Sequence, residues 1–284
     1  MSRPRRPPTR RPRDAATPVR TAAYIAKAVD LARAAAGLGG DIEIALTVVG
    51  GLALAYADGP RPAGQLSRAA AQDPRLFAHL LYTAWARFWI TRPDLVPPTA
   101  PLWAWLRGRP THHQLRGAQQ LALAARVAGV DRLLGDDDSR RGTDLLGLLL
   151  STMRSRVTRA DRGQFYTPQV ATRHMATSLD VHPGQTVVEP AAGTGALLCA
   201  AAAAMRERGH DAAQAWWFAG DIDPLAVGCL AVNTAVWELG PRVVIGCGDS
   251  LDCRDDWVGR ALRQRRAAIA RGDAARLAGM AVRG

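Results

Sequence analysis

Two helical patterns, Ala196–Glu207 and Leu225–Trp237, separate three short runs rich in β-branched and aromatic residues. The runs are Gln185–Val188, Trp216–Ala219 and Arg242–Ile245. Strands that alternate with helices in this way pair in parallel, because each helix returns the chain to the same end of the sheet. The second half of the chain is therefore predicted to form a parallel sheet with helices packed on it.

The first half has a different pattern, with helical periodicity from residue 20 to about residue 140. The predicted helices are Thr21–Ala36, Ile42–Ala57, Leu76–Ile90 and Gln114–Ala128. Gly50-Gly51 weakens the prediction for the second of these helices, because glycine disfavours helix interiors. Asp73-Pro74 fits a helix start. Breaks are expected at Pro93, Pro97, Pro98 and Pro101, and a turn is expected at Gly135–Asp138.

The tryptophan and histidine residues in this half can each be interpreted as structural or as functional. Trp85, Trp103 and Trp105 stand at helical spacing, so core packing is favoured over stacking on nucleic-acid bases. His112-His113 has no third ligand nearby, which favours a surface loop over a metal site. Asp144–Met153 then begins the second half with a leucine-rich helix.

Charge is concentrated at the two ends of the chain. The formal net charge is +12, of which residues 1–13 contribute +6 and residues 254–284 contribute +5. Residues 1–19 are rich in proline and arginine and are expected to be disordered. Residues 257–284 read as an arginine-rich helix. Basic tails bind polyanions such as DNA, and such tails also serve only for solubility in many proteins.

The sequence has no feature of a membrane or secreted protein. Its apolar runs are too short to span a bilayer, and the basic start lacks the apolar segment of a signal peptide. Cys199, Cys229, Cys247 and Cys253 form no CxxC pair, so neither zinc nor a disulfide framework is expected. We therefore expect a reducing cytoplasm, no membrane and no metal.

Acidic and glycine residues follow the predicted strands. Glu189-Pro-Ala-Ala-Gly-Thr-Gly195 lies between a strand and a helix, where Gly193 and Gly195 allow a ligand to approach the backbone. The leading acid disfavours a pyrophosphate and favours a zwitterionic amino-acid ligand such as S-adenosylmethionine, although a plain glycine turn fits as well. Asp221 is placed to accept ribose hydroxyls or to cap a helix, and Asp249 to accept from an adenine amine or to form a turn.

These elements and Gly163-Gln-Phe-Tyr-Thr-Pro168 resemble the gamma-type adenine-N6-specific DNA methyltransferase family, most closely the modification subunits of type I restriction systems. The resemblance covers about residues 142–251. The helix with Asp144-Leu-Leu-Gly147 also resembles the part of the family's sequence that leads to the Gly163 segment. It implies S-adenosyl-L-methionine as cofactor and DNA as partner. The implied cofactor-binding residues are Tyr166, Thr167, Pro168, Glu189, Ala191, Gly193, Gly195, Asp221 and Asp249. The family usually has Asp where Glu189 stands, and Cys where Ala192 stands.

The catalytic element of that family is not found. It reads Asn, Asp or Ser, then Pro-Pro and an aromatic residue, and it holds the flipped adenine after the fourth strand. Pro-Pro occurs here only at Pro7-Pro8 and Pro97-Pro98, and threonine follows both. No catalytic residue is therefore predicted, and the chain reads as truncated before this motif. In this fold class the first strand is central, so we expect it to be a sheet edge here.

The predicted fold class is α/β, a partial Rossmann-like S-adenosylmethionine-dependent methyltransferase fold with an all-α N-terminal domain. The expected parts are a basic tail at 1–19, a helical domain at 20–140, an incomplete methyltransferase-like domain at 141–254 and a helix or tail at 255–284.

Three functions fit these features. The first is an adenine-N6 DNA methylase, or one half of a split enzyme completed by a subunit that supplies the catalytic motif or sequence specificity. The second is a non-catalytic subunit that binds DNA or a partner and keeps the cofactor fold as a scaffold. The third is a methyltransferase for another substrate, against which Gly163–Pro168 argues because that segment is typical of DNA methylases.

Overall fold

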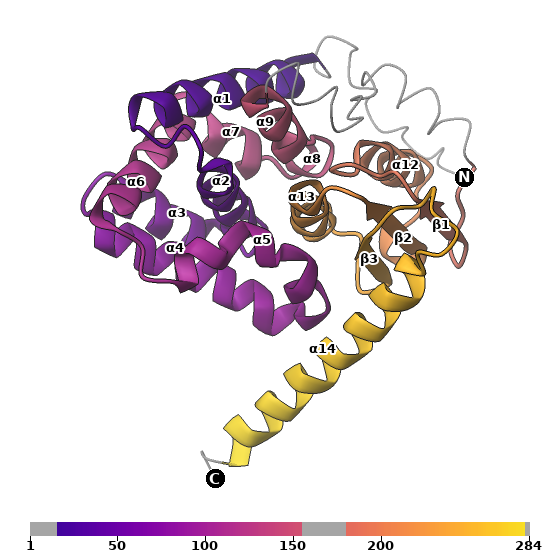
Figure 1. The fold of residues 1–284 in the computed structure, drawn as a ribbon. Helices are drawn as coiled ribbons and strands as arrows, with labels where there is room; N and C mark the ends of the chain where they lie inside the picture. The colour runs from indigo at the N-terminus through magenta and orange to yellow at the C-terminus, as the bar shows by residue number, and fades with distance from the viewer. Residues whose placement is uncertain (1–15, 155–179, 282–284) are drawn as a thin grey trace, which may run out of the picture.

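The computed structural model describes residues 16–154 and 180–281, so predictions for the basic arm before residue 16 lie outside the described residues. Its first half is helical, as predicted (Figure 1). The elements are α1 (Ala16–Ala35), α2 (Ile42–Ala57), α3 (Pro60–Ala70), α4 (Pro74–Thr91), the 3-10 helix η1 (Pro93–Leu95), α5 (Val96–Arg107), α6 (His112–Val127), α7 (Val130–Gly135), α8 (Asp137–Arg141) and α9 (Leu145–Met153).

Helix α2 lies at the centre of this half, and nearly all of it is buried. Its glycine pair is explained by close packing rather than by flexibility. A Cβ at Gly51 would overlap the Leu81 side chain, and a Cβ at Gly50 would lie 3.4 Å from Trp85. Trp85 is fully buried and donates from Nε1 to the Thr47 carbonyl at 3.1 Å. Core packing, the favoured reading of the tryptophans, is thus confirmed for Trp85 and for Trp103, which is also buried.

Three expectations about helix boundaries differ from the structure. Three prolines predicted to break the chain, Pro97, Pro98 and Pro101, lie inside α5. Pro97 and Pro98 are tolerated because the first turn of a helix has backbone N–H groups without intrahelical partners, so a missing N–H costs little there. The predicted turn at Gly135–Asp138 is shorter than expected, because Asp136 already caps α8 through the Ser139 backbone N–H at 3.0 Å. His112-His113, expected in a loop, forms the first turn of α6.

The second half contains a parallel three-stranded sheet in the order β1 (Thr186–Glu189), β2 (Trp216–Asp221), β3 (Val243–Cys247). Helices α12 (Ala196–Glu207) and α13 (Pro224–Val236) connect the strands, and the 3-10 helix η2 (Ala212–Gln214) precedes β2. Within the described residues β1 is a sheet edge, as predicted, and its Val188 side chain is 58% exposed.

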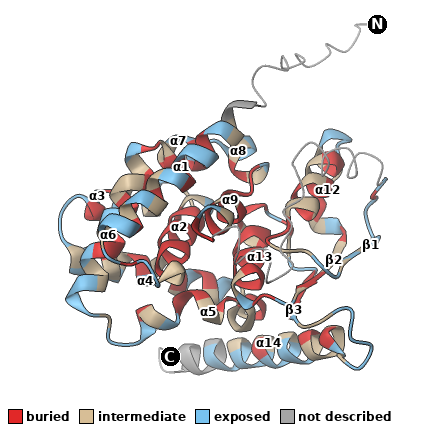
Figure 2. Ribbon diagram, turned by 45° about the horizontal axis from the view of Figure 1, so that its top comes forward, coloured by how far each residue is buried: buried red, intermediate tan, exposed pale blue. Residues whose placement is uncertain are grey.

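Helix α14 (Trp257–Ala281) packs across β2 and β3 from one face of the sheet. The Trp257 ring occupies the space beside Gly220 and Gly246, where added Cβ atoms would lie only 2.8 Å from its ring carbons. The helix then runs beneath α5 to η1, where Gly272 lies against Pro93 (Figure 2). The arginine-rich helix predicted near the end of the chain therefore forms, and it covers β3 rather than β1.

Helix α13 packs on both halves of the molecule. On one side it contacts β2 and β3, and on the other it contacts α2, α5 and α9. Leu102 of α5 lies against Gly228, and Val232 lies near Gly50 of α2. Figure 2 shows α2, α9 and α13 as mostly buried, so one continuous apolar core joins the helices to the sheet.

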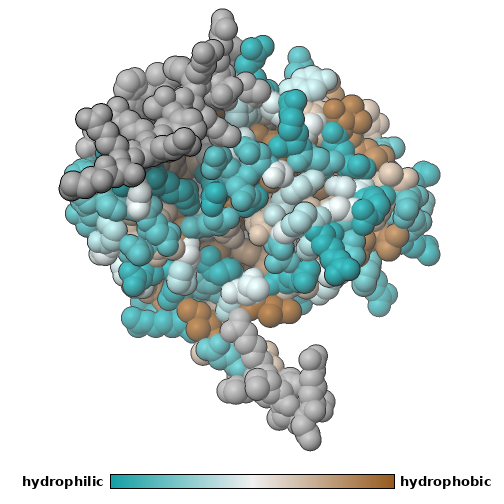
Figure 3. Space-filling model, turned by 180° about the vertical axis from the view of Figure 1, so that it is seen from behind, coloured by the Kyte–Doolittle hydropathy of each residue, from teal (hydrophilic) through white to brown (hydrophobic). Residues whose placement is uncertain are grey.

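The face of the molecule in Figure 3 is largely hydrophilic, and apolar side chains gather on it only in small patches. None of the helices described has the length and apolar character needed to cross a membrane.

Candidate cofactor-binding site

Two of the predicted acidic residues end neighbouring strands of the sheet. Glu189 is the last residue of β1 and Asp221 the last of β2, and Asp249 follows β3 by two residues. The strands are parallel, so all three carboxylates lie at the carboxyl edge of the sheet. Open parallel sheets bind ligands at this edge. The structure thus brings together the acids that the sequence placed far apart.

The glycine loop is fastened to the end of β2 by backbone hydrogen bonds. Gly193 N donates to Asp221 Oδ2 at 2.8 Å, and Ala192 N donates to the Gly220 carbonyl at 2.9 Å. Gly193 and Gly195 have φ values of +54° and +96°, in the left-handed region that favours glycine. A Cβ at Gly195 would also lie 2.6 Å from Leu230, so this position excludes any larger residue.

Asp221 and Asp223 have separate roles at the start of α13. Asp223 caps α13 by accepting from the Leu225 backbone N–H at 3.2 Å. Asp221 accepts from Gly193 N through Oδ2 and from Asp223 N through Oδ1 at 2.9 Å. A carboxylate has about four acceptor positions, so both Asp221 oxygens retain capacity for further donors. Ile222, which follows Asp221, presents an apolar side chain that is 60% exposed.

Asp249 forms a turn. Its Oδ1 accepts from the Leu251 backbone N–H at 2.9 Å, and its own N–H donates to Asp255 Oδ2 at 2.9 Å. Gly248 N donates to the Asp221 carbonyl at 3.0 Å, which holds the start of this turn against the end of β2. The second carboxylate oxygen of Asp249 has no hydrogen bond within the described residues.

Of the remaining residues predicted to bind the cofactor, the structure describes Glu189 and Ala191. Glu189 accepts through Oε1 from the Ala191 backbone N–H at 3.2 Å, and Ala191 is exposed. Tyr166, Thr167 and Pro168 lie outside the described residues. Among the residues described, no three His, Cys, Asp or Glu side chains are grouped to hold a metal ion.

A buried polar network behind the glycine loop was missed by the sequence reasoning. The Asp144 carboxylate accepts from Thr194 Oγ1 at 2.6 Å, from Asn233 Nδ2 at 2.8 Å and from Gly147 N at 2.8 Å. Asn233 Nδ2 also donates to the Thr194 carbonyl at 2.9 Å. Burial raises the pKa of Asp144, although its three hydrogen bonds act in the opposite direction.

This network joins α9, the glycine loop and α13 at one point. Thr194 stands between the two loop glycines, so its side chain and carbonyl fix the loop from behind. One signal in the sequence pointed to it, because Asn233 is an amide residue within the largely apolar helix α13. Buried polar groups require partners, so such an asparagine indicates a network.

A buried ion pair joins the end of α9 to the start of α13. Both Asp223 oxygens accept from the guanidinium of Arg154, and one of these hydrogen bonds measures 3.1 Å. The two side chains are 2% and 3% exposed. Helix α9 is thus held at both ends to the elements that carry the glycine loop and Asp221.

One family model and one solved structure are similar to parts of this chain. The family model described as N-6 DNA Methylase matches residues 144–258, which include α9, the glycine loop, Asp221 and Asp249. One similar solved structure is the type I restriction-modification system methyltransferase subunit from Streptococcus thermophilus, with a TM-score of 0.44 and 15% identity. The match covers 84% of this chain and 59% of that subunit. No curated protein matches the sequence.

Proposed function

We propose that this chain is the S-adenosylmethionine-binding part of an adenine-N6 DNA methylase, because residues 144–258 match the family model described as N-6 DNA Methylase. The cofactor would supply the methyl group, and DNA would be the methyl acceptor. We place the activity in the cytoplasm and assign the cofactor site to residues 141–254, with residues 20–140 as a helical domain.

The observation that carries this proposal is the hydrogen bond between Gly193 N and Asp221 Oδ2 at the carboxyl edge of the sheet. It aligns an open glycine loop with a carboxylate on the neighbouring strand. A cofactor lying across this edge would first contact the loop backbone. Its ribose hydroxyls would then reach Asp221, and its adenine amine would reach Asp249. The exposed Ile222 side chain offers an apolar surface for a flat ring beside Asp221.

The residues of this chain would bind and orient the cofactor, and they include no group assigned to the target adenine. Adenine methylation requires the base to leave the helix stack and to be held by polar and aromatic groups. The Pro-Pro pair that belongs to this element occurs in the described residues only at Pro97-Pro98, in the first turn of α5. Methyl transfer is therefore proposed for an assembly in which residues other than those described here, from this protein or from a partner subunit, supply that element. The second candidate is a scaffold that binds DNA or a partner without transfer.

The test is a titration of the purified chain with S-adenosylmethionine, followed by calorimetry. We expect saturable binding, and about 10- to 100-fold weaker binding by Asp221→Ala, since hydrogen bonds to a charged group contribute about 1.5–3 kcal/mol. Asp41→Ala is the matched control, because its carboxylate makes no capping hydrogen bond at the start of α2. Equal affinity of Asp221→Ala and the unsubstituted chain would refute the ribose role, and a folded chain without binding would favour the scaffold.

A further inference from the structure

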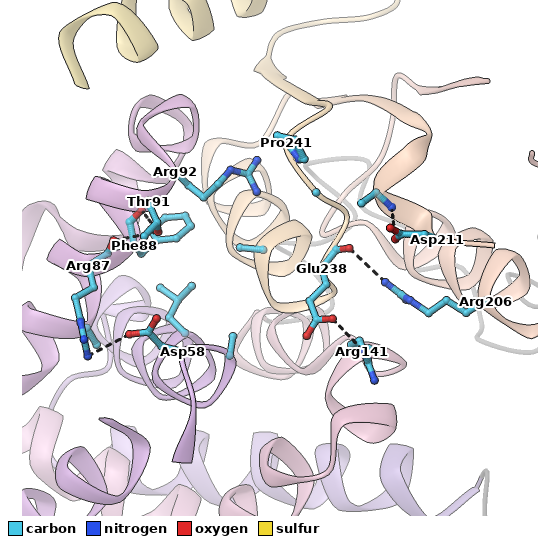
Figure 4. A pocket seen from close by; sticks show the side chains of 16 residues that line it. Asp58, Arg87, Phe88, Thr91, Arg92, Arg141, Arg206, Asp211, Glu238 and Pro241 are labelled. Atoms are coloured by element: carbon cyan, nitrogen blue, oxygen red, sulfur yellow. Dashed lines mark hydrogen bonds and ion pairs between the residues drawn. The ribbon is translucent and has the colours of Figure 1, made fainter. Parts of the chain in front are cut away.

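A cavity of about 730 Å³ lies between the helical half and the sheet (Figure 4). Helix α4 supplies Arg87 and Phe88 on one side, and Arg92 follows at the end of this helix, as Figure 4 shows. Arg141, Arg206 and Glu238 lie on the other side. A cavity of this size falls within the range of small-molecule sites, which often occur where two parts of a fold meet.

The cavity is remote from the proposed cofactor site. Ala213, which precedes β2, and Pro241, which precedes β3, both line it, so it lies at the amino ends of the strands. Asp221, by contrast, ends β2 at the carboxyl edge. A strand rises about 3.3 Å per residue, so the six residues of β2 separate the two places by roughly 15–20 Å.

Most charges around the cavity are paired with one another. Arg87 contacts Asp58 at 3.2 Å. Glu238 is shared by two guanidiniums, with Arg140 on Oε1 at 3.0 Å and Arg141 on Oε2 at 2.9 Å. Arg92 pairs with Asp94 at 2.8 Å, and Asp211 accepts from the Ala213 backbone N–H at 2.9 Å. The carboxylates that line the cavity are thus already engaged.

Arg206 is the exception among the arginines that line the cavity. Its hydrogen bonds within the described part of the chain are made by Nη2 alone, to the carbonyls of Trp237 and Glu238. No carboxylate there forms an ion pair with it. Burial lowers the pKa of Arg206, and the neighbouring Arg141 guanidinium lowers it further. A half-buried cation beside a second cation is stabilised by an anion that reaches both.

A left-handed turn at Glu238 ends helix α13 beside this cluster. Glu238 has a φ of +56°, and it is the sole non-glycine residue with positive φ in the described ranges. Glu238 follows the C-cap residue Trp237, and Leu239 N donates to the Thr234 carbonyl at 3.0 Å, so this left-handed residue forms a common type of helix end. The turn places the Glu238 side chain against Arg140 and Arg141 and its carbonyl against Arg206.

The inner wall of the cavity is apolar. Leu54, Phe88, Ala84 and Ala235 contribute to it, and Leu54 and Phe88 are buried in the core. The cavity therefore combines an apolar wall with a cationic end, an arrangement that suits a ligand with one apolar part and one anionic group.

We propose that this cavity binds a small molecule that carries a phosphate or carboxylate group on an apolar body. Arg206 and Arg141 face the anionic group, and Phe88, Leu54 and Ala235 contact the body. A guanidinium presents several N–H donors in one plane, which matches the oxygens of either group. The site is additional to the proposed methylase activity and does not depend on it.

The experiment is a titration of the full chain with four probes, followed by calorimetry. The probes are phenyl phosphate, benzoate, inorganic phosphate and benzyl alcohol. We expect saturable binding of phenyl phosphate or benzoate that is tighter than binding of inorganic phosphate or benzyl alcohol. The comparison of the first two probes identifies the anionic group, and the last two test whether both parts of the ligand contribute.

Variants then locate the site. Arg206→Gln, which keeps an amide N–H for the carbonyl contacts, is expected to weaken binding at least about tenfold, the loss of one charge-assisted contact. Ala235→Leu on α13 and Ala84→Leu on α4 each fill part of the cavity and are expected to weaken binding without removing charge. Arg266→Gln, an exposed position on α14, is the control and should leave binding unchanged.

Three outcomes would overturn the proposal. They are no binding of either aromatic anion, equal binding of inorganic phosphate and phenyl phosphate, and equal loss in Arg266→Gln and Arg206→Gln. Two cavity-filling variants are used because one of them alone could fail to fold. Binding of S-adenosylmethionine is measured in the same samples, and its result does not affect this test.

Discussion

At the scale of single residues, the most constrained position described is Gly147 in the first turn of α9. A Cβ at this position would overlap Asp144 Oδ2 and Thr194 Oγ1. The glycine therefore allows the Asp144 carboxylate to lie directly beneath the glycine loop. The sequence showed Asp144 and Gly147 as neighbours in a motif, but Thr194 and Asn233 are 50 and 89 residues away from Asp144, and no local pattern connects them.

Gly147→Ala is expected to destabilise the protein by about 2–4 kcal/mol, because overpacking and loss of buried hydrogen bonds act together. Gly64→Ala in α3 is the matched control, since its Cβ would lie 3.5 Å from Arg68 Nη1, at an ordinary contact distance. The control should be neutral or more stable by up to about 1 kcal/mol, because alanine favours helices. Denaturant unfolding of both variants measures the difference, and equal stability would contradict the crowding described.

Burial of the Asp144 carboxyl group should also make the free energy of unfolding depend on pH. Burial raises its folded-state pKa above the ordinary value of 3.8, so the folded chain holds this proton more tightly than the unfolded chain. Its stabilising contribution is therefore fully present below about pH 4 and is lost as pH rises through the folded-state pKa. The Asp144→Asn variant does not titrate at this position.

The free energy of unfolding of the unsubstituted chain should consequently fall relative to that of Asp144→Asn as pH rises above about 4. Chemical denaturation at several pH values measures this difference. A difference that stays constant, or one that increases with pH, would show that the carboxylate is not destabilised by burial.

At the scale of elements, the sequence predicted helices and strands well where periodicity and end signals agreed. Helix α12 begins and ends as predicted, because Gly195 marks its start and alanine and leucine fill its length. Helix α5 was missed because the prolines were read as breaks, although two of them occupy the first turn, where they are tolerated. The helix Ile42–Ala57 was predicted with its observed bounds, and the glycine pair that weakened this prediction allows close contact with Leu81 and Trp85.

The buried ion pair between Arg154 and Asp223 should contribute to stability by holding α9 against α13. Arg154→Met removes the guanidinium that faces the buried Asp223 carboxylate and is expected to cost about 3–5 kcal/mol. Arg87→Met removes a guanidinium from a pair whose side chains are 56% and 42% exposed, and it should cost about 0–1 kcal/mol. Thermal or denaturant unfolding compares the two variants, and similar losses would mean that the buried pair does not fasten α9.

At the scale of the whole molecule, the sequence shows how charge is distributed along the chain, but it does not show which distant helices and strands pack together. The sequence placed +11 of the +12 charge in residues 1–13 and 254–284. It did not predict the cavity, because the walls come from α2, α4, α12 and the segments before β2 and β3. Such a juxtaposition depends on how the helices pack on the sheet, which the spacing of residues along the chain does not determine.

Deleting residues 1–13 should reduce the salt dependence of any DNA binding. The segment holds six arginines, so the slope of log affinity against log salt should become shallower by up to about five units. A full-length variant with those arginines changed to glutamine separates charge from length. Binding measured at several salt concentrations with an unchanged slope would show that the arm contacts no phosphates.

Helix α13 has a consequence for how such a protein can change over evolution. Its residues pack against the sheet on one side and against α2 and α5 on the other, with Gly228 and Val232 at the second contact. A substitution on one side of this helix therefore alters the surface to which the other side must remain complementary. The helical half and the sheet cannot be exchanged between relatives as independent modules, and recombination within this lineage should preserve both halves together.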